Sequence, residues 1–89
     1  MWKELLAPID AYVIYRHGGC RPELRAFRWN HQRYDVSTIE FVHREHAGET
    51  VYLCYSVRCG EEQFAIRFDT KLHCWRLEAI DETPELRQS

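Results

Sequence analysis

Two pairs of metal-ligating side chains are the first feature that suggests chemistry. His17 lies three positions before Cys20, and His43 lies three positions before His46. In an antiparallel meander, the loops after the first, third and fifth strands lie at one end, so both pairs would gather at a single rim. Zinc is held by three or four such ligands at about 2.0–2.3 Å. The sequence therefore allows a zinc site at this rim, although the spacing differs from that of a zinc ribbon or finger. The alternative is histidines scattered over the surface and cysteines that pack as small apolar side chains.

Arginines are concentrated in one segment near the N-terminus. Between residues 16 and 33 there are five arginines and one acidic residue, Glu23, which gives a local charge of +4. These arginines are Arg16, Arg21, Arg25, Arg28 and Arg33. Arginine forms bidentate contacts with phosphates and stacks on bases. The segment therefore predicts a basic hairpin that binds nucleic acid weakly.

The aromatic residues in the same segment bear on this hypothesis. Phe27 and Trp29 share one face of the predicted strand, and we expect them in the core, with the arginines solvated around its edge. The opposite face, with Leu24 and Ala26, carries nothing large enough to fill an interior. A stacking surface for bases would then have to come from the remaining tyrosines, Tyr12, Tyr15 or Tyr52.

The sequence contains none of the familiar catalytic motifs. It has no Gly-rich phosphate loop, no nucleophile elbow and no HExxH. Cys54 lies within a predicted strand, where a reactive thiolate is seldom supported. The acidic residues beside His43 and His46 are typical of a solvated hairpin loop. We therefore expect a protein that is not an enzyme and has no cofactor, with zinc as the one candidate ligand.

The elements that must position these residues are indicated by an alternation of apolar and polar residues with a period of two. From Asp10 to Ile80 the pattern predicts six antiparallel strands with short turns, preceded by a short helical segment over Trp2–Ala7 that Pro8 ends. A change of phase predicts a bulge or bend near Ser37-Thr38. So short a meander should curl into a small all-β barrel or half-barrel. The predicted core is Phe27, Trp29, Tyr34, Val36, Leu53, Tyr55, Val57, Phe64, Ile66, Phe68, Trp75 and Leu77.

Length and composition limit the architecture to a single small domain. The 89 residues carry a net charge of −2 and are 45% hydrophobic. We assign residues 1–89 to one domain with its core in 10–80 and a polar tail in 81–89. The longest uninterrupted apolar run, at 11–15, is far shorter than the roughly 20 residues of a membrane span. With no signal peptide in the sequence, we expect a cytoplasmic protein whose four cysteines stay reduced.

Several aromatic pairs recur in a recognisable order. They are Phe-x-Trp at 27–29, Tyr-x-Val at 34–36, Phe-x-Ile-x-Phe-Asp at 64–69 and Trp-x-Leu at 75–77, after Arg-Pro at 21–22. This order is similar to that of a family of small bacterial all-β domains of uncharacterised function. Some members of the family are encoded with or near translesion (Y-family) DNA polymerases. The resemblance implies an accessory domain linked to DNA metabolism and carries over no binding residue.

Together these observations favour a non-catalytic interaction module. An open sheet presents unpaired edges, and Trp2, Tyr15 and Tyr52 are aromatic residues of the kind found at the centres of interfaces. We expect a protein partner or a homodimer joined through a sheet edge, and no membrane. Nucleic-acid binding by the arginine-rich hairpin is the second hypothesis, and zinc binding at the rim is the third.

Overall fold

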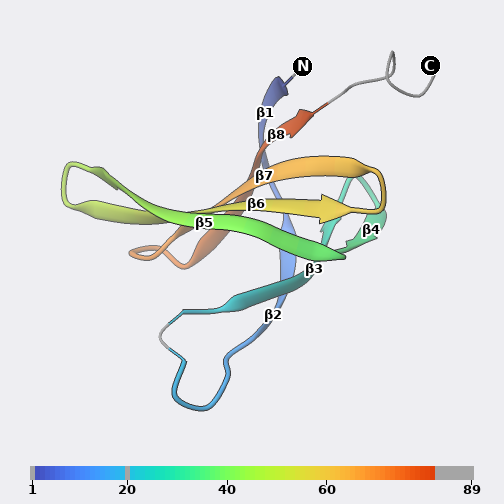
Figure 1. The fold of residues 1–89 in the computed structure, drawn as a ribbon. Coiled ribbons are helices and arrows are strands. Elements are labelled where there is room, and N and C mark those ends of the chain that lie inside the picture. The colour runs from blue at the N-terminus through green and yellow to red at the C-terminus, as the bar shows by residue number, and fades with distance from the viewer. Residues whose placement is uncertain (1, 20, 82–89) are drawn as a thin grey trace.

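The computed structural model describes residues 2–19 and 21–81, and this part of the chain forms strands and turns only. It contains no helix long and apolar enough to cross a membrane. Figure 1 shows the strands in chain order. They are β1 (Trp2–Pro8), β2 (Asp10–Ile14), β3 (Glu23–Trp29), β4 (Gln32–Asp35), β5 (Thr38–Ala47), β6 (Thr50–Cys59), β7 (Glu62–Asp69) and β8 (Cys74–Asp81). Residues 82–89 of the predicted polar tail lie outside the described residues.

The strands form two antiparallel sheets. The large sheet has five strands in the order β1-β8-β7-β6-β5, and the small sheet has three in the order β2-β3-β4. The all-β prediction is confirmed. The six-strand meander is wrong, because the described chain has eight strands, and these two sheets do not form a closed barrel.

The difference in strand number arises where the chain passes from one sheet to the other. Beyond β1 the backbone N–H of Ile9 still bonds to the carbonyl of Trp75, at 3.3 Å, before β2 joins the small sheet. Beyond β4 the N–H of Val36 bonds to Arg25 in the small sheet, and that of Ser37 bonds to Arg58 in the large sheet. The change of phase near Ser37-Thr38 thus divides one predicted strand into β4 and β5.

The predicted helix over Trp2–Ala7 is wrong, because this segment is strand β1. It pairs with β8, with Lys3 opposite Ile80, so its backbone groups find partners in the sheet rather than within a helix. Leu5 packs against the core from this position. Leu6 has a φ of 54° at an irregularity in the pairing between Glu4 and Ala7. Pro8 fits because β1 is an edge strand, where a missing N–H leaves no partner unpaired.

The core lies between the two sheets. Eight of the twelve predicted core residues are buried, and the other four, Trp29, Tyr34, Val36 and Trp75, are half-buried against them. The aromatic rings pack in pairs, among them Phe27 with Phe64 at 5.1 Å and Phe68 with Trp75 at 4.5 Å between ring centroids. Alternation of residues therefore identified the core correctly in most strands.

The expectation that Leu24 and Phe27 lie on opposite faces of β3 is wrong. Both are buried, at 1% and 0% exposure. The register with β2 shifts between Tyr12 and Val13, so that Arg25 is an extra residue on β3. The extra residue reverses the alternation, so Leu24 and Ala26 lie on opposite faces and Leu24 shares the inner face with Phe27.

Candidate functional site

The outer face of the small sheet carries exposed aromatic and basic side chains. Tyr12 and Ile14 on β2 are 41% and 42% exposed. Arg28 on β3 lies opposite Arg33 on β4, and Arg25 is the exposed extra residue of the bulge. Leu24, Phe27 and Trp29 occupy the inner positions of β3, which leaves these side chains pointing outward. We call Tyr12, Ile14, Arg25, Arg28 and Arg33 the small-sheet face.

Tyr12 and Arg33 meet above the middle strand of this sheet. The guanidinium carbon of Arg33 lies 4.8 Å from the centroid of the Tyr12 ring. Ala26 on β3 pairs with Tyr12 in register, and it is 1% exposed because the two larger side chains close over it. A residue as small as alanine at this position permits the cation–π contact, which holds the Tyr12 ring in place.

Carboxylates neutralise part of the positive charge on the small-sheet face. Arg33 bonds to Asp35 at 2.9 Å, and Arg25 bonds to Glu23 at 3.2 Å. Arg28 has no carboxylate partner within residues 2–19 and 21–81. Of the three arginines on this face, Arg28 is therefore the one whose charge no described carboxylate offsets.

The other two predicted nucleic-acid residues line a cavity that adjoins this face at Glu23, the carboxylate that Arg16 shares with Arg25. Arg16 follows β2 and makes a bidentate contact with Glu23, with bonds of 3.1 and 2.9 Å. This contact lowers the pKa of Glu23, chiefly through the hydrogen bond from Arg16. Arg21 precedes β3, and with Arg16 it lines a cavity of about 460 Å³ whose apolar wall includes Ile39, Val42 and Tyr55. The arginine-rich segment therefore extends from the small-sheet face, through the carboxylate shared by Arg25 and Arg16, to the edge of this cavity.

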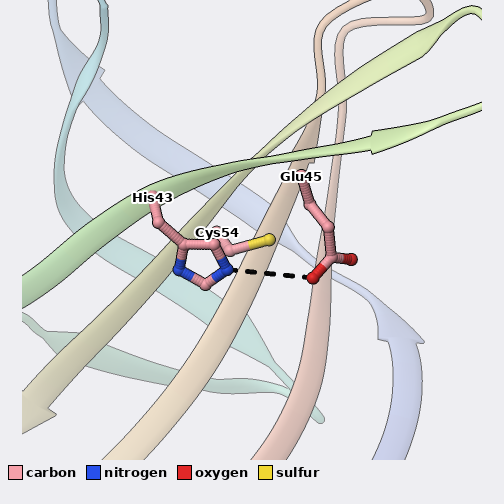
Figure 2. Close-up of side chains that lie close together, drawn as sticks. All are labelled: His43, Glu45 and Cys54. Atoms are coloured by element: carbon pink, nitrogen blue, oxygen red, sulfur yellow. Dashed lines mark ion pairs between the residues drawn. The ribbon is translucent and has the colours of Figure 1, made fainter.

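A second cluster lies on the outer face of the large sheet. His43 and Glu45 project from β5 and Cys54 from β6, and their ligand atoms all lie within 4.8 Å of one another (Figure 2). The Nε2 atom of His43 lies 3.8 Å from Oε2 of Glu45. We call these three residues the His43 cluster.

The β5–β6 hairpin builds the His43 cluster. Its turn at Gly48-Glu49 sets Ala47 opposite Thr50, and four residues earlier His43 lies opposite Cys54. Residues two apart in a strand share a face, so Glu45 lies on the same side as His43. His46, three positions from His43, pairs with Val51 further along the hairpin and is not in the cluster.

Arg67 on β7 organises the surroundings of this cluster. Its Nη2 atom bonds to Oε1 of Glu45 at 2.9 Å and to Oε2 of Glu78 at 2.6 Å. Its guanidinium also lies 4.7 Å from the centroid of the Tyr52 ring. The Nε atom of Arg67 is buried without a hydrogen-bond acceptor. Arg67 therefore fixes one oxygen of Glu45 and leaves the other oriented toward His43.

The thiol of Cys54 is neutral in this environment. Burial raises its pKa above the ordinary value, the charges of Glu45 and Glu78 raise it further, and Arg67 opposes the shift. A buried thiol of raised pKa is a poor nucleophile. The raised pKa therefore argues against a catalytic cysteine.

The predicted zinc ligands that the structure describes do not form one cluster. Of His17, Cys20, His43 and His46, only His43 belongs to the His43 cluster. Cys20 lies outside the described residues, and His17 lies in the loop between β2 and β3. Sequence reasoning missed Glu45 and Cys54. The signal that identifies them is the two-residue turn at Gly48-Glu49, which fixes the register of the hairpin.

Comparisons with protein-family models, with curated proteins and with solved structures find no match to this chain. The resemblance to domains encoded near translesion polymerases therefore rests on the spacing of the aromatic residues. The features that bear on function are therefore the small-sheet face and the His43 cluster.

Proposed function

We propose that the protein is a non-catalytic interaction module that binds a protein partner through the small-sheet face. The observation that carries the proposal is the pair of exposed apolar side chains, Tyr12 and Ile14, flanked by arginines on a rigid sheet. Tyrosine and arginine are the residue types enriched among the energetically dominant contacts of protein interfaces. Because Arg33 already holds the Tyr12 ring, little conformational entropy is lost when a partner covers it.

The charge balance of the face favours a protein over a nucleic acid. Asp35 pairs with Arg33, and Glu23 pairs with both Arg25 and Arg16, so the two carboxylates offset two of the four positive charges of Arg16, Arg25, Arg28 and Arg33. Nucleic-acid affinity depends mainly on neutralised phosphates, which requires several free cations. A partner with an apolar patch and a carboxylate positioned for Arg28 fits this surface.

The backbone of β2 offers a second contact to the same partner. β2 lies at the edge of the small sheet and pairs only with β3, so one side of its backbone has no partner strand among the described elements. A strand of the partner added there would place alternate side chains beside Tyr12 and Ile14. This is the sheet-edge pairing that we expect from the sequence, and we assign it to β2.

Site-specific photo-crosslinking tests the proposal. A photoreactive phenylalanine analogue replaces Tyr12 in one variant and Phe41, on the large sheet, in a matched control. We expect a crosslinked protein from position 12 alone, identified by mass spectrometry in cells that produce the chain. The identified partner, once purified, should bind the unmodified protein and lose at least about tenfold in affinity with Ile14→Asp.

Two results would contradict the proposal. One is equal crosslinking from positions 12 and 41, and the other is partner binding that is unchanged by Ile14→Asp. A crosslink to a second copy of this chain would assign the face to self-association, which sedimentation velocity over a concentration series would then have to show. Phe41→Asp is the control substitution for binding, since Phe41 is 58% exposed on a different sheet.

The stacking of Arg33 on Tyr12 favours one second candidate, single-stranded nucleic acid. Aromatic rings flanked by arginines are the usual stacking surface for unpaired bases. Fluorescence anisotropy with a labelled single-stranded oligonucleotide, at low and moderate salt, tests this candidate. It requires salt-sensitive binding that Arg28→Ala plus Tyr12→Ala weakens and that Arg44→Ala, on the β5–β6 hairpin, leaves unchanged. Absence of binding at low salt excludes it.

A further inference from the structure

We propose that the His43 cluster binds a divalent metal ion of the zinc class, with Nε2 of His43, a carboxylate oxygen of Glu45 and Sγ of Cys54 as ligands. This site lies on the large sheet and goes beyond the interaction proposed for the small-sheet face. The two proposals involve no residue in common, so each can fail without the other.

The geometry of the three ligand atoms is close to that of a bound site. At metal–ligand lengths of about 2.0–2.3 Å, atoms around a tetrahedral ion lie roughly 3.3–3.7 Å apart. The Nε2 of His43 and the Oε2 of Glu45 are already 3.8 Å apart, and all three atoms lie within 4.8 Å of one another. Small rotations of the His43 and Glu45 side chains would bring their ligand atoms within this tetrahedral spacing of the Cys54 Sγ. Both side chains are about half exposed, at 45% and 49%, so the ion has a path from solvent.

The three ligand types favour a cation of intermediate hardness, such as Zn²⁺. Imidazole nitrogen, thiolate sulfur and carboxylate oxygen are the three kinds of donor that hold Zn²⁺ in proteins, whereas Mg²⁺ and Ca²⁺ require oxygen ligands. Arg67 bonds to one oxygen of Glu45 and so supports the ligating carboxylate from behind, as outer contacts do in known metal sites. Three protein ligands leave a fourth position for water.

The charges of the cluster balance those of the ion. Without metal, the carboxylates of Glu45 and Glu78 face the guanidinium of Arg67, which leaves one negative charge. When M²⁺ binds, the Cys54 S–H bond breaks, the proton leaves to solvent and a metal–sulfur bond forms. The thiolate brings the charge of the surrounding residues to −2, which balances the +2 charge of the ion. The thiolate also places a negative charge beside Arg67, whose buried Nε–H has no acceptor now.

Cobalt titration of the reduced, metal-free protein tests the site. Co²⁺ takes the same ligands as Zn²⁺ and reports thiolate ligation through a charge-transfer band in the near ultraviolet. We expect one equivalent of Co²⁺ to produce this band and Zn²⁺ to abolish it by displacement. Cys54→Ser should remove the band, while His43→Ala and Glu45→Gln should weaken Co²⁺ binding at least about tenfold.

Matched controls come from the same hairpin and the same residue types. His46→Ala on β5 and Cys74→Ser on β8 should retain both the band and the affinity. The proposal is overturned if the unaltered protein gives no charge-transfer band, or if the band survives Cys54→Ser. It is also overturned if Glu45→Gln, an exposed substitution that leaves the fold intact by circular dichroism, binds Co²⁺ as tightly as the parent.

Discussion

The hydroxyl of Tyr55 donates a hydrogen bond of 2.5 Å to the carbonyl oxygen of Pro22. Tyr55 lies at the centre of β6 and Pro22 lies just before β3, so the bond joins the large sheet to the small one. Both partners are buried, the Tyr55 residue being 2% exposed. A buried hydroxyl requires such an acceptor, since an unpaired one costs about 1–3 kcal/mol.

Removal of this hydroxyl should destabilise the protein. We expect Tyr55→Phe to lower the free energy of unfolding by about 1–3 kcal/mol, because it leaves the Pro22 carbonyl buried without a donor. Urea unfolding followed by circular dichroism measures the change. Tyr15→Phe is the matched control, since Tyr15 is 66% exposed, and it should alter stability by less than about 0.5 kcal/mol. Equal effects of the two substitutions would mean that the Tyr55 bond contributes nothing.

The same tyrosine should make stability fall at alkaline pH. Burial raises the pKa of Tyr55 from 10 to about 12, so between these values the unfolded chain loses the phenolic proton while the folded protein keeps it. This contribution to stability is complete below pH 10 and is lost as pH rises through about 12. Urea unfolding across this range should show a steeper fall for the parent than for Tyr55→Phe, with a difference on the order of 1 kcal/mol. Parallel curves would contradict the assignment.

The three described cysteines should differ in their rates of alkylation. Cys74 is exposed, whereas Cys54 is buried and Cys59 is half-buried. Burial, with the charges of Glu62 and Asp35, raises the pKa of the Cys59 thiol to about 11, so almost no thiolate exists at neutral pH. Peptide mapping after brief treatment with iodoacetamide should find Cys74 modified well before Cys54 and Cys59. Modification of Cys59 at the rate of Cys74 would contradict this prediction, because it would show that the end of β6 is open to solvent.

One turn offers a stabilising substitution. Asn30 and His31 connect β3 to β4 with φ values of 55° and 65°, in the left-handed region that glycine adopts without cost. His31→Gly should therefore raise the free energy of unfolding by about 0.5–1 kcal/mol. The control, His46→Gly, replaces a strand residue and should lower it. Thermal or urea unfolding compares the two variants, and a loss of stability with His31→Gly would contradict the argument.

The sequence predicts the class of fold and most of the core, because alternation reports burial directly. Prediction from the sequence fails where the strand pairing is irregular. The bulge at Arg25 brings Leu24 into the core, and no local pattern distinguishes this from a regular strand that faces outward. The segment Trp2–Ala7 has helical spacing on its own, and it is a strand only because β8, some seventy residues later, offers its backbone an open edge.

For the candidate sites too, the sequence predicts some residues, and the folded structure determines the others. His43 is recognisable as a ligand from its type, but its partners depend on the pairing of two strands. Spacing along the chain favoured His46, which a strand places away from His43, while the hairpin register brings Cys54 beside it. The arginine-rich segment is visible in the sequence, whereas the pairing of Arg33 with Asp35 and of Arg16 with Glu23 depends on the folded strands.

The chain passes between the sheets twice, at Ile9 and at Val36-Ser37, and at both places the backbone bonds continue from one sheet into the next. Because the two sheets also share one core, we expect neither sheet to detach while the other stays folded. The domain should open as one cooperative unit. Amide hydrogens on β3 and on β7 would then exchange with solvent through the same global event and at the same free energy.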